Sequence, residues 1–138
     1  EIYSLSLHDA LPILLLNTRN RLLRDVRATV GLADRSLVHS REVFRQAIAA
    51  ASSRVLLVHN HPGGDPTPSS DDIQITCRLA EAGRIVGIEV LDHIIVGTRT
   101  ASCPQDWLSF REAGLLHGPR SGFPAKTATR QRQGEHQP

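Results

Sequence analysis

The hydrophobic positions of this chain follow two periods, which predict that strands and helices alternate along it. An apolar run at 14–16, a polar turn and alternating apolar positions over 22–30 predict a β-hairpin. Spacings of three and four predict a helix over 41–51 and another over 70–82, which Gly83 ends. The pattern also predicts strands over 54–58, 85–91 and 93–96, and a short closing helix over 107–114. This order is typical of an α/β domain.

The strand predicted over 54–58 is apolar from Val55 to Val58, which is typical of a central strand covered on both faces. His59 and His61 follow it two residues apart. Because alternate side chains of a strand point to the same side, both imidazoles are expected on one face of the sheet. They stand at the carboxyl end of the strand, where open α/β sheets usually bind ligands.

A loop rich in Pro and Gly separates these histidines from Ser69 and Asp72, which begin the next predicted helix. Ile75 and Leu79 follow Asp72 by three and seven residues, so its carboxylate leans toward the buried side, where it needs a partner. Two histidines and one carboxylate with an open fourth position form the ligand set of a catalytic zinc. Ser69 and Asp72 also fit a helix capping box, Ser-x-x-Asp, and both roles are compatible.

Composition and charge place this chain among soluble single domains. It has 138 residues, 40% of them hydrophobic, and a formal net charge of +2. The first 116 residues hold 12 basic and 13 acidic side chains, so only the tail is basic. No apolar run approaches the roughly 18 residues of a membrane span, which predicts a cytoplasmic protein without a membrane partner. Cys77 and Cys103 lack CxxC spacing and are expected to be free thiols.

Basic residues of the hairpin raise a nucleic-acid alternative. Four arginines occur there: Arg19, Arg21, Arg24 and Arg27. No aromatic residues alternate with them to stack on bases, so a solvated strand face is the favoured interpretation.

The two ends of the chain differ from its centre. Residues 1–13, EIYSLSLHDALPI, resemble the translation of a common sequencing-adapter oligonucleotide, which indicates an artefactual start outside the fold; a genuine short element is the alternative. Residues 117–138 combine few apolar side chains with scattered Gly, Pro, Gln and Arg, which predicts a disordered tail. The predicted domain therefore spans 14–116.

The spacing His59-x-His61, seven residues, then Ser69-x-x-Asp72 resembles the JAMM signature of the JAB/MPN metalloprotease superfamily. The longer string HNHPGGDPTPSSDD, with LDHIIVG from residue 91 and SFREAG from residue 109, is similar to the RadC family. The resemblance covers the predicted domain. It implies a mixed β-sheet flanked by helices, in the JAB/MPN, cytidine-deaminase-like architecture.

The resemblance also implies a reaction. Zinc (Zn²⁺) would be held by His59, His61 and Asp72, and its bound water would attack a peptide or isopeptide bond of a peptide or protein substrate. Ser69 would donate a hydrogen bond to the oxyanion. A glutamate on an early strand would accept the proton of the water.

That glutamate is where this sequence departs from the family pattern. The matching position falls near Asp9, within the adapter-like residues, and Asp is one methylene shorter. Glu42 lies on the first predicted helix and is expected to form a structural ion pair. Two alternatives to the hydrolase therefore remain: a metal-binding domain without turnover, and a nucleic-acid-binding module associated with DNA repair. Asp92 and His93 are expected to form structural hydrogen bonds.

Overall fold

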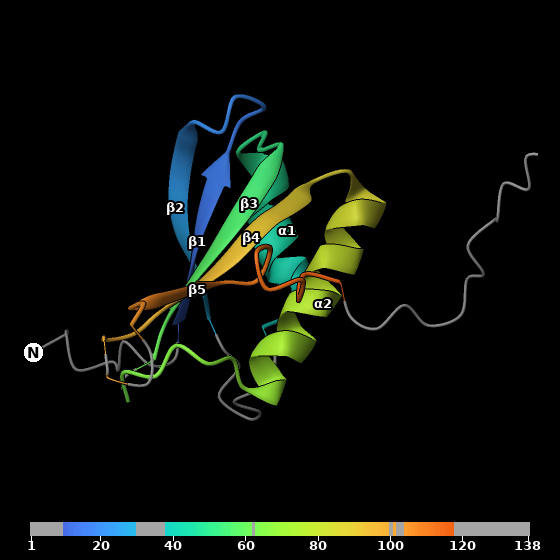
Figure 1. The fold of residues 1–138 in the computed structure, drawn as a ribbon. Helices are drawn as coiled ribbons and strands as arrows, with labels where there is room; N and C mark the ends of the chain where they lie inside the picture. The colour runs from blue at the N-terminus through green and yellow to red at the C-terminus, as the bar shows by residue number, and fades with distance from the viewer. Residues whose placement is uncertain (1–9, 30–37, 62, 100, 102–103, 118–138) are drawn as a thin grey trace, which may run out of the picture.

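The structure is a computed structural model, and it describes residues 10–29, 38–61, 63–99, 101 and 104–117. The described residues form a five-stranded sheet and two helices, and Figure 1 shows the helices packed against the sheet. The elements, in chain order, are β1 (Ala10–Leu16), β2 (Leu22–Thr29), α1 (Ser40–Ala49), β3 (Arg54–Asn60), α2 (Ser70–Val86), β4 (Glu89–Val96) and β5 (Trp107–Ser109). The expected α/β class with a mixed sheet flanked by helices is confirmed.

The sheet has the strand order β2-β1-β3-β4-β5. The β1–β2 hairpin is antiparallel, β1 is antiparallel to β3, and β5 is antiparallel to β4. Only β3 and β4 run parallel, and α2 forms the connection between them. A parallel pair needs such a crossover because its strands start at the same edge of the sheet. The carboxyl end of β3 and the start of α2 consequently lie close together.

Burial alternates along the central strand β3. Val55 and Leu57 are fully buried, whereas Leu56 and Val58 are half-buried. The buried face continues across β1 through Ile13 and Leu15. Among the described residues, full coverage of β3 is therefore limited to one face, and the prediction of two covered faces was wrong on this point. His59 follows Leu57 by two residues and shares its face.

The two helices meet at a glycine, which corrects the predicted end of α2. A Cβ atom on Gly83 would lie 3.1 Å from the ring of Phe44 in α1 and 2.3 Å from the carbonyl oxygen of Ile88. Gly83 is therefore a close-packing position inside the helix, and α2 continues to Val86. The helix ends at Gly87, whose φ of 77° lies in the left-handed region that glycine adopts without strain.

Strand pairing accounts for two further differences between the predicted and the observed elements. The predicted strands 85–91 and 93–96 form one strand, β4, which begins only after the end of α2. An irregularity in the β3–β4 register between Val55 and Leu56 accommodates an extra residue in β4. The predicted helix over 107–114 begins instead with β5, which pairs with 94–96, and continues as a turn. A short apolar segment can adopt either form, and here the free edge of β4 selects the strand.

Strand β1 begins at Ala10, and the side chains of Leu11 and Ile13 are buried, so residues before position 14 contribute to the core. Asp9 and residues 118–138 lie outside the described residues. Leu116, near the end of the described chain, is also buried.

Cys77 is a free thiol, as expected, and Cys103 lies outside the described residues. No helix in the described part of the chain is both long enough and apolar enough to cross a membrane.

Candidate metal centre

The carboxyl end of β3 supplies two of the predicted ligands. His59 lies in the strand, and the amide of His61 donates to the carbonyl oxygen of Val96 at 3.0 Å, which extends the β3–β4 pairing beyond the strand. Their imidazole rings lie 4.8 Å apart between centroids, at 85° to each other. Both rings therefore project from the same face of the sheet.

The start of α2 supplies the third predicted ligand, and the capping box that the sequence suggested is present. The Ser69 hydroxyl oxygen accepts a hydrogen bond from the Asp72 amide at 3.1 Å. The Ser69 amide in turn donates to Asp72 Oδ2 at 2.8 Å. This reciprocal pair satisfies two amides that have no partner within the helix, and it fixes the direction of the Asp72 carboxylate.

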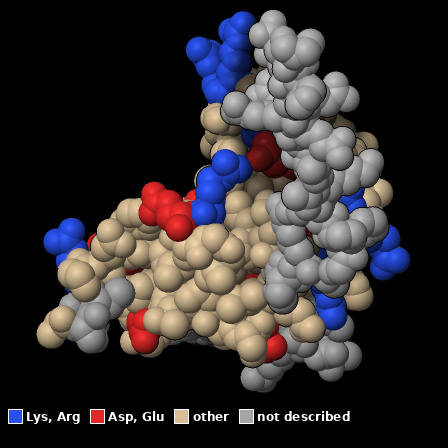
Figure 2. All heavy atoms as spheres, turned by 45° about the vertical axis from the view of Figure 1, so that its right-hand side comes forward, with Lys and Arg blue, Asp and Glu red and all other residues tan. Residues whose placement is uncertain are grey.

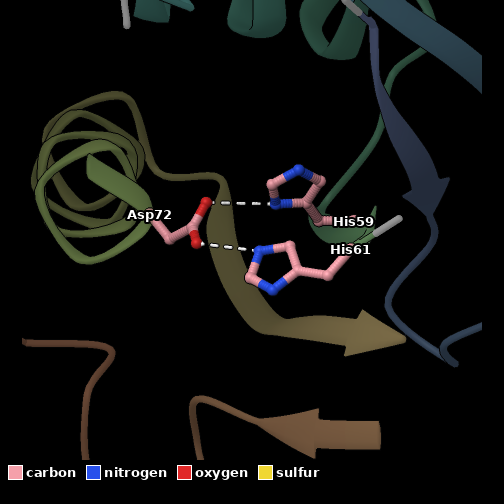
Figure 3. Close-up of side chains that lie close together, drawn as sticks. All are labelled: His59, His61 and Asp72. Atoms are coloured by element: carbon pink, nitrogen blue, oxygen red, sulfur yellow. Dashed lines mark hydrogen bonds and ion pairs between the residues drawn. The ribbon is translucent and has the colours of Figure 1, made fainter. Parts of the chain in front are cut away.

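The carboxylate faces both histidines, as Figure 3 shows. Asp72 Oδ1 lies 3.1 Å from His59 Nδ1, and Asp72 Oδ2 lies 3.1 Å from His61 Nε2. The candidate ligand atoms of the three residues all lie within 4.8 Å of one another. The structure thus brings together the three ligands that the sequence predicted, from two elements that are consecutive in the chain.

The proton of the His61 ring is positioned by the loop between β3 and α2. His61 Nδ1 lies 2.8 Å from the backbone carbonyl oxygen of Asp65. Because a carbonyl can only accept, Nδ1 carries the hydrogen and Nε2 is left with a lone pair in the neutral ring. That lone pair points at an oxygen of Asp72, so the space between them suits a cation, either a proton or a metal ion.

The same loop is held against the end of β4. The Thr98 amide donates to the carbonyl oxygen of Gly64 at 2.7 Å. Gly64 has a φ of 85°, and a Cβ atom on Gly97 would lie 2.2 Å from the Gly64 carbonyl oxygen. Close backbone contact at these two glycines holds the segment that carries the Asp65 carbonyl. Asp65 itself forms a local turn with Thr67, whose side chain and amide donate to its carboxylate and lower its pKa.

Electrostatics favour an ionised Asp72 at this position. Burial alone would raise its pKa, but contact with the His59 ring and hydrogen bonds from Ser69 outweigh that effect and hold the pKa well below its usual value. An ionised carboxylate with two imidazoles is a suitable donor set for a divalent cation.

A metal ion fits the donor atoms that are present. His59 Nδ1 is buried and 3.1 Å from Asp72 Oδ1, yet it forms no hydrogen bond among the described residues. In a tetrahedral zinc site, donor atoms about 2.1 Å from the ion lie about 3.4 Å from one another. The two imidazole–carboxylate distances of 3.1 Å are close to that separation. A small expansion of the site would admit the ion.

Ser69 lies beside the three ligands and is exposed to solvent. Its oxygen accepts a hydrogen bond from the Asp72 amide. The predicted role of Ser69 toward a reaction intermediate stays a prediction, whereas its role as the helix cap is confirmed.

Glu42 is separate from this cluster. Its carboxylate pairs with Arg45 at 3.0 Å and with Arg41 at 3.7 Å on the surface of α1. The expectation of a structural ion pair is confirmed.

Asp92 also has the structural role that the sequence suggested. Its carboxylate accepts hydrogen bonds from the amides of His93 and Arg111 and from the hydroxyl of Ser109. It therefore ties the turn after β5 to β4.

His93 is the residue whose surroundings the sequence did not reveal. Its side chain is 1% exposed, its ring stacks on Phe110 with centroids 4.5 Å apart, and it lies over the His59 ring at 6.1 Å. Burial, aided by the neighbouring His59, lowers the pKa of His93 to about 4. Leu57 pairs with His93 in the parallel β3–β4 register, and His59 follows Leu57 by two residues, so the His93 and His59 side chains project from the same face of the sheet. This relationship depends on strand register, which the sequence pattern does not reveal.

Comparison with known proteins identifies the family of this chain. The family model of the RadC-like JAB domain matches residues 2–115. The chain belongs to the RadC-like JAB domain family. A UPF0758 protein of Pelobacter propionicus is 53% identical over 104 residues, and one of Geotalea uraniireducens is 50% identical over 103. A third, from Geobacillus thermodenitrificans, is 48% identical over 101 residues.

These alignments cover 73–75% of this chain but only 42–43% of the relatives. The chain therefore spans less than half the length of the curated relatives it matches. The resemblance to the RadC family is confirmed, and the cluster of His59, His61 and Asp72 is a candidate metal site of this RadC-like domain.

Proposed function

We propose that this RadC-like domain is a zinc-dependent hydrolase of peptide or isopeptide bonds. The observation that carries the proposal is the convergence of His59, His61 and Asp72, whose candidate ligand atoms lie within 4.8 Å of one another. Imidazole nitrogens favour zinc and other transition metals over magnesium or calcium, which prefer oxygen ligands. Two nitrogens and one carboxylate oxygen also leave a tetrahedral ion one position free for catalysis.

The residues around the cluster have separable tasks in this proposal. A zinc ion bound there would supply a Lewis acid and lower the pKa of a coordinated water. His61 is oriented by the Asp65 carbonyl, and Asp72 by the Ser69 amide. The Ser69 hydroxyl lies at the exposed edge, where it could donate to the oxygen of a scissile carbonyl as negative charge develops.

A protein or peptide substrate is more consistent with the surface than a nucleic acid. On the face shown in Figure 2, the described basic and acidic side chains form small separate groups. Nucleic-acid binding without sequence preference depends on a continuous basic groove with aromatic residues for stacking. The hairpin arginines, Arg19 to Arg27, are exposed and have no aromatic residues between them.

A metal-binding domain without turnover is the second candidate. Within the described residues, the candidate metal group contains a single carboxylate, Asp72, which serves as a ligand. The position that the family pattern assigns to the proton acceptor falls near Asp9, outside the described residues. Zinc binding and hydrolysis must therefore be measured separately.

Metal content tests the shared part of both candidates. The purified protein should hold about one zinc per chain by elemental analysis, and His59→Ala should remove it. His39→Ala is a matched control, because His39 is exposed at the start of α1 and its side chain forms no cap hydrogen bond. Equal zinc content in all three proteins would contradict the proposed ligand set.

Hydrolysis of a fluorogenic isopeptide or peptide separates the two candidates. Zinc-dependent cleavage that falls by about 100-fold in Ser69→Ala, with zinc content retained, would support the hydrolase. Ser69→Thr keeps the hydroxyl and the cap, so it should retain more activity. A zinc-loaded protein that cleaves neither substrate class would favour the silent metal-binding domain.

A further inference from the structure

A buried chain of hydrogen bonds lies behind the metal ligands. The Thr76 hydroxyl is 2.6 Å from the backbone carbonyl oxygen of Asp72 and 2.6 Å from His93 Nδ1. Thr76 and His93 are both fully buried, so water does not compete for these contacts. These hydrogen bonds join β4 to the turn of α2 that carries Asp72.

The direction of each hydrogen bond follows from the number of hydrogens. A carbonyl oxygen only accepts, so the single hydroxyl hydrogen of Thr76 is used for Asp72. The Thr76 oxygen must then accept from His93, which places the ring hydrogen on Nδ1. His93 Nε2 consequently carries a lone pair, and it has no hydrogen-bond partner among the described residues.

An unpartnered buried acceptor is unfavourable, and an apolar ring would fill this space without that cost. The favourable interactions of this histidine are therefore the hydrogen bond at Nδ1 and the stacking of its ring. Phe110, His93 and His59 form a series of near-parallel rings, with interplanar angles of 18° and 23°. His93 is thus linked to two of the proposed ligands. Its ring stacks on the His59 ring, and its Nδ1 is connected to the Asp72 backbone through the Thr76 hydroxyl.

We propose that His93 and Thr76 are positioning residues of the metal centre. The Nδ1–H tautomer of His93 donates to the Thr76 hydroxyl, which donates to the Asp72 carbonyl, and these two bonds fix the position of Asp72 on α2 relative to His59 on β3. This inference rests on the proposed function, because it concerns ligands of the proposed zinc. Residues that orient metal ligands typically change metal affinity by about 10- to 100-fold when they are replaced.

Nuclear magnetic resonance of the histidine rings tests the tautomer in metal-free protein. Long-range nitrogen–hydrogen spectra should show His93 as the neutral Nδ1–H form. Thr76→Val removes the hydroxyl at nearly constant volume, and it should mix the His93 tautomers and shift the His59 ring signals. Thr76→Ser keeps the hydroxyl and should preserve both signatures. An Nε2–H tautomer in the unchanged protein would overturn the inference.

Metal binding tests the positioning role. Thr76→Val should weaken Zn²⁺ binding by at least about tenfold and alter the visible absorption of the Co²⁺ form, and Thr76→Ser should restore both. Thr18→Val, in the exposed hairpin turn, controls for the substitution itself. Unfolding of the metal-free variants shows that each one is folded.

The two proposals fail in different ways. If the unchanged protein binds neither Zn²⁺ nor Co²⁺, the proposed function is overturned. If it binds both but Thr76→Val binds them with unchanged affinity and the same Co²⁺ spectrum, the positioning role alone is overturned.

Discussion

Ser69 and Asp72 form hydrogen bonds to each other in both directions, and the Asp72 carboxylate faces both His59 and His61. The Asp72 amide donates to the Ser69 hydroxyl oxygen at 3.1 Å, and the Ser69 amide donates to Asp72 Oδ2 at 2.8 Å. The capping box at the start of α2 therefore also sets the orientation of a candidate metal ligand. Asp72 completes the capping box of α2, and the same side chain places its carboxylate at the end of β3.

Asp72→Asn should separate these two tasks. The amide oxygen of asparagine can still accept from the Ser69 amide, but the side chain loses the negative charge that a divalent ion requires. In the unchanged protein, free zinc at about 100 times its dissociation constant should raise the free energy of unfolding by about 2.7 kcal/mol. This increase should be absent in Asp72→Asn by thermal or urea unfolding, with helix content by circular dichroism unchanged. Equal zinc stabilisation would show that Asp72 is not a ligand.

Gly97→Ala should disturb the loop that orients His61. The new Cβ atom would meet the Gly64 carbonyl oxygen at 2.2 Å, and the loop backbone would have to move. Both zinc affinity and stability should decrease. Gly63→Ala is the matched control, because no atom lies within 4 Å of its Cβ position and its φ is not positive. Calorimetric zinc titration of the two variants checks this, and equal affinities would contradict the proposed role of the contact.

Gly87→Ala should affect stability alone. Gly87 ends α2 with a φ of 77° and has open space around its Cβ position, so alanine there is strained without a clash. The expected cost is about 1 kcal/mol of unfolding free energy. Zinc affinity should be unchanged, since the cap lies at the other end of α2 from Asp72. A large loss of zinc binding would indicate that the helix shifts as a unit.

The stability of the metal-free protein should decrease in mild acid because of His93. Its pKa is about 4 in the folded protein against an ordinary value of 6.5, so the unfolded chain binds the proton more readily. The contribution is complete above pH 6.5 and is lost as the pH falls toward 4, by about 3 kcal/mol at most. Urea unfolding across this range should show a smaller pH dependence for His93→Gln. Equal slopes for both proteins would contradict the buried neutral ring.

Glu42→Gln should change neither zinc content nor catalytic activity. The Glu42 carboxylate pairs with Arg45 and Arg41 at the surface, where such pairs contribute about 0–1 kcal/mol. Elemental analysis and the isopeptide assay check the variant. A large loss of hydrolysis with zinc retained would assign Glu42 a role in proton transfer that its position on α1 does not suggest.

Local chemistry explains which parts of the site the sequence could predict. The two-residue spacing of His59 and His61 fixes their common face in any strand, and Ser69 with Asp72 encodes a helix start within four residues. Both features depend on neighbours in the chain. The boundary at Gly83 was wrong because a glycine can end a helix or allow a close helix contact, and only the position of Phe44 distinguishes these roles.

The sequence by itself determined the α/β class and the three ligand candidates, because these depend on periodicity and short spacing, and its longer motif strings carried the resemblance to the RadC family. Only the tertiary structure decided that 107–109 pairs with β4 as a strand, that Glu89–Val96 is continuous, and that His93 lies behind His59. These features depend on strand register and on contacts between residues far apart in the chain. A free sheet edge, a close helix contact and a buried ring acquire their roles only when the layers pack together.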